Sequence, residues 1–462
     1  MKKIHLIGIG GTGLSAIAHL LLEKGYQVSG SDRAASTFTD NLVQAGAVVS
    51  IGHAAKNING ADVIVRSSAV TADNPEVKAA EAAHIPLLKR SEFLGELLKD
   101  YTSLAVAGTH GKTTTTSMLA WALADAGYDP SYIIGGISKN LGNNAHAGKG
   151  PYFVIEADEY DGMFLGLNPT WAVVTTMEHD HPDCYPTPQD YAGAFYAFVS
   201  RIKPHGGLLV CGDSPELLQL RGHVPAPAQF LTYGLSPENT YSAQSLAVGN
   251  AGISQFTLAY QGKAVLPVRM PLPGEHNVRN ALAVMGICHQ LEIDLARAAA
   301  ALARFTGSGR RFDVIGIAQN ITLIDDYGHH PTEIRATLQA ARSRYPVSRI
   351  WAVWQPHTYS RTMTLFNDFV QAFQAADCVV VTEVYAARES NPGFSAAQLL
   401  GKMPHAHKHF SPDLDEATAH LENNLQPGDV VLVFSAGDAN LISVRLLEFL
   451  NRKISQKEIS NG

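Results

Sequence analysis

The sequence predicts an α/β protein with parallel sheets, built from more than one domain. Short apolar runs alternate with helix-length amphipathic stretches along almost the whole chain, which is typical of α/β units. A single hydrophobic core stops growing at about 250–300 residues, and this chain has 462 residues. Two to four domains are therefore expected.

The apolar runs fall into three groups. The first comprises IHLIGIG, YQVSGSD, DVIVRSSA and IPLLKR, and the helical pattern SEFLGELLKD closes it. The second runs from SLAVAG to GGLLVCGD and continues into a more β-like patch, SQFTLAYQGKAVLPVRM. The third runs from ITLIDDYG to DVVLVFSAGD and follows a Gly-Ser-Gly hinge in FTGSGRRFD. We therefore expect domains over residues 1–100, 101–310 and 311–462.

The net charge and composition of the chain disfavour nucleic acid and membranes as binding partners. The net charge is −7 and no run of five basic residues occurs, which disfavours a nucleic-acid groove or an anionic membrane surface. The four cysteines are far apart and form no C-x-x-C pair, so a reducing cytoplasm fits better than a disulfide framework. No apolar run reaches the roughly 18 residues of a membrane span. We expect a cytoplasmic monomer or homodimer that binds neither nucleic acid nor membranes.

The segment VAGTHGKTTTT, residues 106–116, has the pattern of a phosphate loop. It lies between an expected strand and an expected helix. In such a loop the backbone N–H groups and the helix end surround an anion, Lys112 reaches terminal phosphates and the Thr113 hydroxyl ligates Mg²⁺. The strict pattern requires glycine where this chain has Val106.

Two acidic segments follow the next strands of the same group. VIEADEYDG ends an apolar run with Glu156, Asp158, Glu159 and Asp161. A carboxylate at a strand end beside a phosphate loop is well placed for Mg²⁺, although a solvated acidic turn would look the same. MEHDHPDCY contains His179, Asp180, His181 and Asp183. This second segment is compatible with zinc, with the same Mg²⁺ or nucleotide site, or with a structural turn.

The first glycine loop has the pattern G-x-G-x-x-G at Gly8, Gly10 and Gly13, and Asp32 ends the next expected strand. This arrangement is typical of dinucleotide-binding folds. The physical requirement is only a pyrophosphate at a helix N-terminus and a polar group for the nucleoside. NAD, FAD and a UDP-sugar all satisfy it, so the motif leaves the choice open.

The third group of strands carries two clusters of polar residues. IDDYGHHPTEI contains Asp325, Asp326, Tyr327, His329 and His330, and WQPHTYSRT contains His357 and Arg361. Ligands of open α/β sheets bind at such carboxyl ends of strands, so a ligand cleft is predicted here. Arg310 and Arg311 lie beside the hinge. An arginine at this position would reach a γ-phosphate when the third domain closes.

Taken in order, GIGGTG, GTHGKTTTT, EADE, DHPD, GEHNVRNALA, GSGRRFD, DDYGHHPTE, QPHTYSRT and SAGD resemble the Mur ligases over essentially the whole chain. The resemblance is greatest to the branch that adds L-alanine to UDP-N-acetylmuramate. It implies a Rossmann-like domain for the UDP-sugar, a central phosphate-loop ATPase domain and a Rossmann-like third domain for the amino acid. It also implies ATP and Mg²⁺ as cofactors, and amide formation through an acyl phosphate in peptidoglycan synthesis.

The resemblance implies these site residues. The ATP site comprises Gly108, Thr109, His110, Gly111, Lys112, Thr113, Thr114, Asn277, Asn280, Arg311 and Asp326. The UDP-sugar site comprises Gly8, Gly10, Gly11, Thr12, Gly13, Asp32, Ser67 and Ser68. The amino-acid site comprises Tyr327, His329 and Arg361. The metal ligands are Thr113, Glu156 and His181, and the catalytic set is Lys112, His181, Arg311, His329, His357 and Arg361.

Three other functions compete with this one. A recycling ligase of the same family would attach a preformed tripeptide to UDP-N-acetylmuramate. Both it and the alanine-adding branch lack the modified lysine of later-acting members, and this chain has no lysine between DHPD and Lys203. An NAD-dependent oxidoreductase would explain the first glycine loop but leave Lys112 and Thr113 without a role. A nucleotide sensor would bind ATP without turnover.

Overall fold

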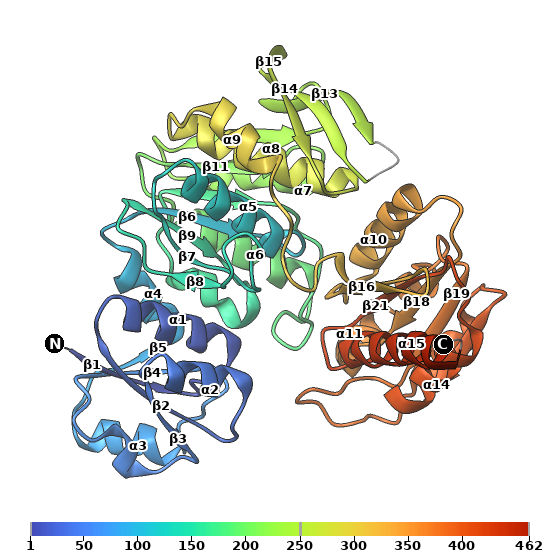
Figure 1. Ribbon diagram of the computed structural model, residues 1–462. Helices are drawn as coiled ribbons and strands as arrows, with labels where there is room; N and C mark the ends of the chain where they lie inside the picture. Colours follow the sequence, from blue (N-terminus) through green and yellow to red (C-terminus); the bar gives the residue numbers. More distant parts are fainter. Residues whose placement is uncertain (1, 249–251, 461–462) are drawn as a thin grey trace.

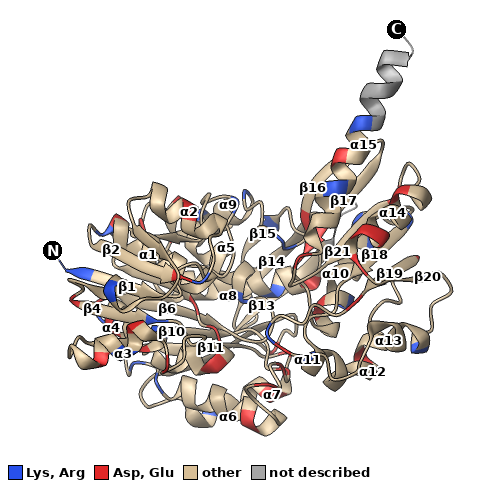
Figure 2. Ribbon diagram, turned by 90° about the horizontal axis from the view of Figure 1, so that it is seen from below, with Lys and Arg blue, Asp and Glu red and all other residues tan. Residues whose placement is uncertain are grey.

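The protein forms three lobes, each built on its own sheet (Figure 1). The structure is a computed structural model and describes residues 2–248 and 252–460. The predicted α/β class is confirmed. Figure 2 shows acidic and basic residues interleaved over all three lobes. In the described part of the chain, no helix combines the length and apolar character needed to cross a bilayer.

The N-terminal lobe has a five-stranded parallel sheet in the order β3-β2-β1-β4-β5. The strand order reverses at β1, and the carboxyl end of β1 leads into the first glycine loop. Open α/β sheets bind ligands at such a reversal point. The strands are β1 (Lys3–Ile7), β2 (Gln27–Asp32), β3 (Val48–Ile51), β4 (Val63–Arg66) and β5 (Leu87–Lys89). The helices are α1 (Thr12–Glu23), α2 (Thr37–Gln44), η1 (Ala55–Ile58), α3 (Pro75–Ala82) and α4 (Arg90–Leu98).

The central lobe has a ten-stranded sheet in the order β15-β14-β13-β12-β11-β10-β6-β9-β7-β8. Its strands are β6 (Thr102–Ala107), β7 (Ser131–Ile133), β8 (Ala145–His146), β9 (Tyr152–Glu156), β10 (Trp171–Val174), β11 (Gly207–Cys211), β12 (Gln229–Gly234), β13 (Tyr241–Val248), β14 (Ser254–Tyr260) and β15 (Lys263–Met270). Its helices are α5 (Lys112–Asp125), η2 (Tyr160–Gly166), α6 (Pro188–Val199), α7 (Pro215–Leu218), η3 (Gln219–His223), α8 (Glu275–Gln290) and α9 (Leu295–Leu302). The neighbouring strands β7, β9, β6, β10, β11, β12 and β13 pair in parallel. The edge strand β8 pairs with β7 antiparallel, and β13, β14 and β15 form an antiparallel extension at the other edge.

The C-terminal lobe has a six-stranded sheet in the order β16-β17-β21-β18-β19-β20, parallel except for β16. Its strands are β16 (Asp313–Ala318), β17 (Ile321–Asp326), β18 (Ile350–Trp354), β19 (Cys378–Thr382), β20 (Lys408–Ser411) and β21 (Val430–Phe434). Its helices are α10 (Pro331–Arg344), α11 (Tyr359–Thr364), α12 (Phe366–Val370), α13 (Ala396–Lys402), α14 (Leu414–Asn424) and α15 (Asn440–Ser460).

The lobes differ in how they are held together. One contiguous apolar cluster of buried residues extends through the N-terminal and central lobes, from Ile4 to Phe305. The C-terminal lobe has apolar clusters of its own, formed by residues of that lobe alone. Its described contacts to the central lobe include many polar ones, and these contacts form the candidate site.

Candidate active site

The phosphate loop adopts the backbone that an anion site needs. It connects β6 to α5, and α5 begins at Lys112. Gly111 is the N-cap of α5, with a left-handed φ of 79°. Gly108 has φ 131°, and a Cβ there would collide with Thr175. Because Gly111 has no side chain to cap α5, the first N–H groups of this helix are available to a phosphate.

Lys112 lies at the mouth of this loop among carboxylates. Its Nζ donates to the Gly108 carbonyl at 2.5 Å and forms an ion pair with Glu159 Oε1 at 2.9 Å. Burial disfavours the charged lysine, but the acidic residues around it, above all Glu159, outweigh burial and raise the pKa of Lys112. Lys112 therefore stays protonated and can neutralise a terminal phosphate.

Thr113 and Glu156 form an oxygen-only pair beside the loop. Thr113 Oγ1 donates to Glu156 Oε1 at 3.0 Å, and the Gly135 N–H donates to Glu156 Oε2 at 2.7 Å. Burial raises the pKa of Glu156 despite the nearby Lys112. A half-buried carboxylate with incomplete charge compensation, next to a hydroxyl and an anion site, fits the preference of Mg²⁺ for oxygen ligands.

The third predicted metal ligand, His181, lies in a different cluster. Its Nε2 is 3.6 Å from Glu159 Oε1 and 3.7 Å from Asp180 Oδ2. Burial opposes protonation of His181, but Asp180 and Glu159 raise its pKa. Glu159 Oε2 is buried and has no hydrogen-bond partner among the described residues. A cation bound at His181 would therefore have a carboxylate close by.

A cavity of about 380 Å³ extends from the phosphate loop to the C-terminal lobe. Eight predicted ATP-site residues line it: His110, Gly111, Thr113, Thr114, Asn277, Asn280, Arg311 and Asp326. Gly108, Thr109 and Lys112 belong to the same loop but do not line this cavity. Residues that sequence analysis did not assign complete the wall, among them His276, Arg279, Thr332 and Glu333. Both lobes thus contribute to one nucleotide-sized space.

Asp326 and Arg311 bring charge to the cavity from the C-terminal lobe. Asp326 ends β17 and accepts from the N–H groups of Phe312 and Gly328, at 2.8 and 2.7 Å. Burial raises the pKa of Asp326 to about 6, and Arg311 opposes the shift. The Arg311 guanidinium is 3.4 Å from Glu333 Oε1 and keeps its charge because Glu333 and Asp326 outweigh the cost of burial.

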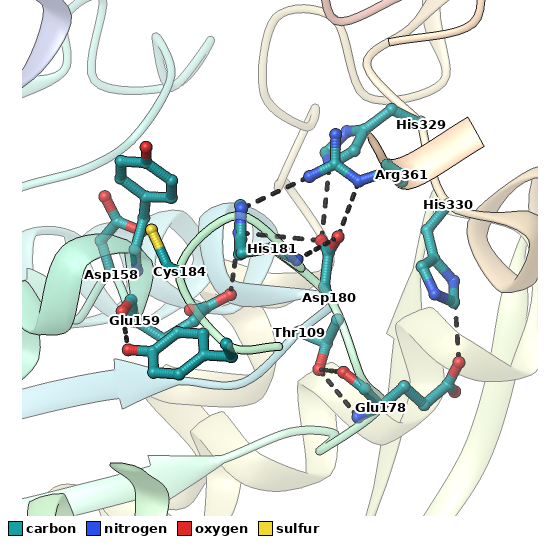
Figure 3. A network of polar contacts seen from close by, with 12 residues as sticks. Thr109, Asp158, Glu159, Glu178, Asp180, His181, Cys184, His329, His330 and Arg361 are labelled. Atoms are coloured by element: carbon teal, nitrogen blue, oxygen red, sulfur yellow. Dashed lines mark hydrogen bonds and ion pairs between the residues drawn. The ribbon is translucent and has the colours of Figure 1, made fainter. Parts of the chain in front are cut away.

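A buried ion pair joins the two lobes next to the phosphate loop (Figure 3). Arg361 Nε donates to Asp180 Oδ1 at 2.6 Å, and the two side chains are 5% and 3% exposed. Other N–H groups of Arg361 face the His357 carbonyl at 3.0 Å and His181 Nδ1 at 3.4 Å. Arg361 was expected to be a cation for the amino acid, and here it already has a carboxylate partner.

The predicted histidines of the C-terminal lobe surround this pair. His329 Nε2 is 3.8 Å from Asp180 Oδ2, and its ring centroid is 6.1 Å from that of His357. Burial and Arg361 lower the pKa of His329, and burial and His329 lower that of His357 to about 3. Both rings are therefore neutral at pH 7. The ring centroid of the predicted Tyr327 is 5.4 Å from that of His329, and the Arg311 guanidinium is 5.1 Å from the Tyr327 centroid.

The first glycine loop is fixed by a hydrogen bond to Asp32. Asp32 Oδ2 accepts from the Gly10 N–H at 2.8 Å, so Asp32 fixes the loop between β1 and α1. Ser67 lies against Gly8, where a Cβ would come within 3.0 Å of the Ser67 Cβ. The remaining predicted residues are Gly11, the N-cap of α1, Thr12 and Gly13 in its first turn, and Ser68, exposed just after β4.

Arg90 is a residue of this region that sequence analysis missed. Its guanidinium occupies the space where a Cβ on Gly13 would lie. Arg90 is also the first residue of α4, so its positive charge lies near the N-termini of both α1 and α4. Cations are unfavourable at helix N-termini, and the ion pair with Asp158 at 3.4 Å compensates the charge only partly. This arrangement favours an anion at the glycine loop.

Sequence reasoning also missed three acidic residues at the boundary between the central and C-terminal lobes. Asp180 was noted only within MEHDHPDCY, and Glu178 and Glu333 were given no role. The segment PTE at the start of an expected helix signals a first-turn acid, which usually serves the helix itself. Only the contact of the two lobes shows that Glu333 faces His110 and Arg311.

Comparison with known proteins matches three family models in succession. Residues 3–102 match the model described as Mur ligase family, catalytic domain. Residues 106–288 match the Mur ligase middle domain, and residues 310–437 match the model described as Mur ligase, glutamate ligase domain. Together these matches cover most of the chain in the order of its lobes.

Individual relatives are similar over nearly their whole length. UDP-N-acetylmuramate–L-alanine ligase of Syntrophotalea carbinolica is 43% identical over 98% of this chain and 99% of its own. The enzyme of the same name from Desulforamulus reducens is 42% identical over 98% of both chains. The crystal structure of UDP-N-acetylmuramate-alanine ligase from Thermotoga maritima superposes with a TM-score of 0.82 at 30% identity, covering 98% of this chain and 100% of that one. The murein peptide ligase of Psychrobacter arcticus gives 0.72 at 25% identity, covering 97% and 99%. This chain belongs to the Mur ligase family.

Proposed function

We propose that this chain is an ATP-dependent ligase that joins L-alanine to the lactyl carboxylate of UDP-N-acetylmuramate, in the synthesis of peptidoglycan precursors. The observation that carries the proposal is the cavity that the phosphate loop shares with the C-terminal lobe, which Arg311 lines. Lys112 belongs to the same loop, and the buried pair of Arg361 and Asp180 lies at the boundary between the two lobes. Relatives that bear the name of this activity are 42–43% identical over nearly their full length, which supports it.

Each of the three domains would bind one of the three substrates. Residues 1–100 bind the UDP-sugar, with the pyrophosphate at the glycine loop and the start of α1, where Arg90 adds positive charge. Residues 101–310 bind ATP through the N–H groups of the phosphate loop. Residues 311–462 bind the amino acid. Closure of the third domain over the second completes the ATP site, because Arg311 and Asp326 reach the cavity only from that side.

In the first step the substrate carboxylate attacks the γ-phosphorus of ATP. A bond forms between carboxylate oxygen and phosphorus, the bond to the bridging oxygen breaks, and ADP leaves. Two anions must approach each other, so the reaction needs positive charge that is already in place. Lys112 and Arg311 provide it. The product is an acyl phosphate, which contains a leaving group that a free carboxylate lacks.

The oxygen ligands Thr113 and Glu156 would hold Mg²⁺ at the phosphates, and His181 would contribute to a second ion. Bound Mg²⁺ supplies further neutralisation of phosphate charge. The hydrogen bond between Thr113 and Glu156 fixes both oxygens at the loop before any ion arrives.

In the second step the amine of L-alanine attacks the acyl carbon, and phosphate leaves. The alanine ammonium must first lose a proton. His329 suits this role because its Nδ1 lies 3.0 Å from the Tyr327 carbonyl and donates to it, which leaves the Nε2 lone pair free. The pKa of His329 is lowered by burial and by Arg361, so the ring is an available base at neutral pH.

The ion pair of Asp180 and Arg361 suits a zwitterionic substrate. A free amino acid carries a carboxylate and an ammonium on adjacent atoms, and this pair presents the two opposite charges 2.6 Å apart. Arg361 would take the alanine carboxylate and Asp180 the ammonium, next to His329. Enclosure between the lobes keeps water away from the acyl phosphate, which would otherwise hydrolyse.

Phosphate release tests the proposal. The chain is incubated with ATP, Mg²⁺, UDP-N-acetylmuramate and L-alanine, and each co-substrate is omitted in turn. If the chain is this ligase, ATP should release phosphate only when UDP-N-acetylmuramate and L-alanine are both present. Turnover with a tripeptide but not with L-alanine would identify the recycling activity instead. NAD reduction without phosphate release would identify an oxidoreductase, and ATP binding without turnover a sensor.

A further inference from the structure

Two histidines and a glutamate meet across the boundary between the central and C-terminal lobes, and the proposed reaction uses none of their side chains. His110 comes from the phosphate loop, Glu178 follows β10, and His330 caps α10. One ligand atom from each lies within 4.8 Å of the other two. His110 Nε2 and His330 Nδ1 are 3.5 and 3.7 Å from Glu178 Oε2.

The surroundings orient the ligand atoms of His110 and Glu178 inward, whereas His330 Nδ1 also accepts the N-cap hydrogen bond of α10 from the Thr332 N–H at 3.3 Å. His110 Nδ1 is 3.4 Å from Glu333 Oε1, while its Nε2 is buried with no hydrogen-bond partner among the described residues. A carboxylate behind one ring nitrogen, with the other nitrogen facing a cluster of ligands, is the arrangement that orients metal-binding histidines. Thr332 Oγ1 donates to Glu178 Oε2 at 2.6 Å and fixes the carboxylate. Figure 3 shows Glu178 turned toward His330.

We propose that His110, Glu178 and His330 form a binding site for a divalent transition-metal ion such as Zn²⁺, separate from the Mg²⁺ site at Thr113 and Glu156. Two imidazole nitrogens and one carboxylate oxygen are ligands that Zn²⁺ favours, whereas Mg²⁺ prefers a shell made mostly of oxygen ligands. Tetrahedral Zn²⁺ with bonds of about 2.0–2.2 Å places its ligand atoms about 3.4 Å apart. The spacings to Glu178 are close to that value. A fourth position is left for water.

Bound Zn²⁺ would tie two lobes together, since His110 and Glu178 belong to the central lobe and His330 to the C-terminal lobe. The lobes must part to release ADP and product. Zn²⁺ therefore inhibits ligation by holding the closed arrangement, even with Mg²⁺ in excess. Burial opposes protonation of His110, but Glu333 and Glu178 outweigh burial and raise its pKa to about 9. Zn²⁺ must therefore displace that proton, as it does at any protonated imidazole, and replace the hydrogen bond from the Thr332 N–H to His330 Nδ1. The inhibition rests on the proposed function, whereas the binding does not.

Binding is tested on the full chain without substrates, by calorimetric titration with Zn²⁺ and by the visible absorption of Co²⁺ as a probe. Variant His330→Asn removes one ligand but keeps a residue that caps helices well. Variant Glu178→Gln removes the charged ligand. Each is expected to weaken Zn²⁺ binding about 100-fold or more, because even outer-shell changes cost about 10–100-fold. The control is His409→Asn, which removes a ring of the stacked surface pair His409–His420.

The outcomes separate the site from its alternatives. Wild type and His409→Asn should bind Zn²⁺ alike, and excess Mg²⁺ should not displace it. Unchanged affinity in both site variants, or displacement by Mg²⁺, overturns the proposal. If His330→Asn does not fold, as judged by circular dichroism, Glu178→Gln decides alone.

In the ligation assay the concentration of Zn²⁺ for half-inhibition should rise in the site variants by the same factor as the dissociation constant. Lack of ligation by the wild type would overturn the proposed function but leave the binding result intact.

Discussion

At the scale of single residues, the phosphate-loop lysine gives the sharpest prediction. Lys112→Ala should lower the rate of phosphate release by at least about 10³-fold, because the charge facing the γ-phosphate is lost. Binding of the UDP-sugar should persist, since its proposed site lies in another lobe. Steady-state kinetics and calorimetry with UDP-N-acetylmuramate measure the two properties. The surface variant Lys99→Ala is the control, and loss of both properties in a folded Lys112→Ala protein would contradict the division into domains.

Arg90 is the second single residue to test, because it is proposed to bind the pyrophosphate of the UDP-sugar. Arg90→Ala should raise KM for the UDP-sugar about 10–100-fold, because a charge-assisted hydrogen bond to a phosphate contributes about 1.5–3 kcal/mol. The value of kcat should change little. Arg90→Lys should recover part of the loss, because it restores the charge without the planar fork. Initial rates at varied UDP-sugar concentration distinguish this result from an effect on kcat alone.

A buried acid in the N-terminal lobe predicts how stability depends on pH. Glu76 is fully buried and accepts hydrogen bonds from Ser31 Oγ at 2.6 Å and Asn57 Nδ2 at 2.7 Å, and His5 Nε2 lies 3.1 Å away. Burial raises the pKa of Glu76, but His5, Ser31 and Asn57 outweigh burial and lower it from 4.5 to about 2. The folded value is depressed, so this stabilisation is present above pH 4.5 and lost as the pH falls toward 2.

The linked free energy amounts to at most about 3 kcal/mol, from 1.36 kcal/mol per pKa unit. Glu76→Gln should therefore lower stability at pH 7 and flatten its decline between pH 4.5 and 2. Urea unfolding of both proteins across this range measures the difference. Parallel curves at all pH values would show that Glu76 is not the group that titrates.

How far a residue could be predicted depended on whether it lies in a local motif. Lys112, Thr113 and Glu156 follow strands of one sheet, so the motif alone brought them together. Asp180 could not be paired with Arg361 from sequence, because the two are 181 positions apart and meet only when two lobes close. Arg90 carries no local signal beyond a basic residue at a helix start.

At the scale of elements, the loop after β10 and the helix α11 are joined by one buried charge pair. Removing one partner of such a pair costs about 3–5 kcal/mol, because the other charge is left buried and alone. Here the orphaned charge can regain water if the lobes separate. Asp180→Leu and Arg361→Met should each increase the radius of gyration measured by small-angle X-ray scattering. The double variant should remain closer to wild type, and a double variant that opens further than either single one would contradict this account.

The elements themselves were predictable where they lie inside a sheet. β6, β9, β10, β17, β18 and β21 are runs of buried apolar residues, and the sequence pattern identified each of them. Strands at or near sheet edges, such as β3, β16 and β20, were not foreseen, because their residues are only partly buried and their pattern is mixed. The long antiparallel extension was recognised only as a more β-like patch.

At the scale of the whole molecule, the distribution of apolar cores predicts two folding units rather than three. The N-terminal lobe has a small apolar cluster of its own, but its larger cluster continues into the central lobe, whereas the clusters of the C-terminal lobe contain residues of that lobe alone. A chain of residues 311–462 should therefore fold when produced alone, and so should a chain of residues 1–310. A chain of residues 1–100 should not, because it would expose the face that packs on the central lobe. Circular dichroism and cooperative unfolding in urea test all three fragments.

The same division predicts what each fragment can do. The 1–310 fragment should bind UDP-N-acetylmuramate with nearly the affinity of the full chain, since the glycine loop and Arg90 are intact. It should release no phosphate from ATP, because Arg311 and Asp326 are missing from the cavity.

Mixing the 1–310 fragment with the 311–462 fragment should restore little activity. The polar contacts between the lobes would then have to form between two separate chains, which carries the entropic cost of association. Full activity of the mixture would show that the two fragments associate far more tightly than an interface of this composition should allow. Phosphate release by the 1–310 fragment alone would show that the C-terminal lobe is not part of the ATP site.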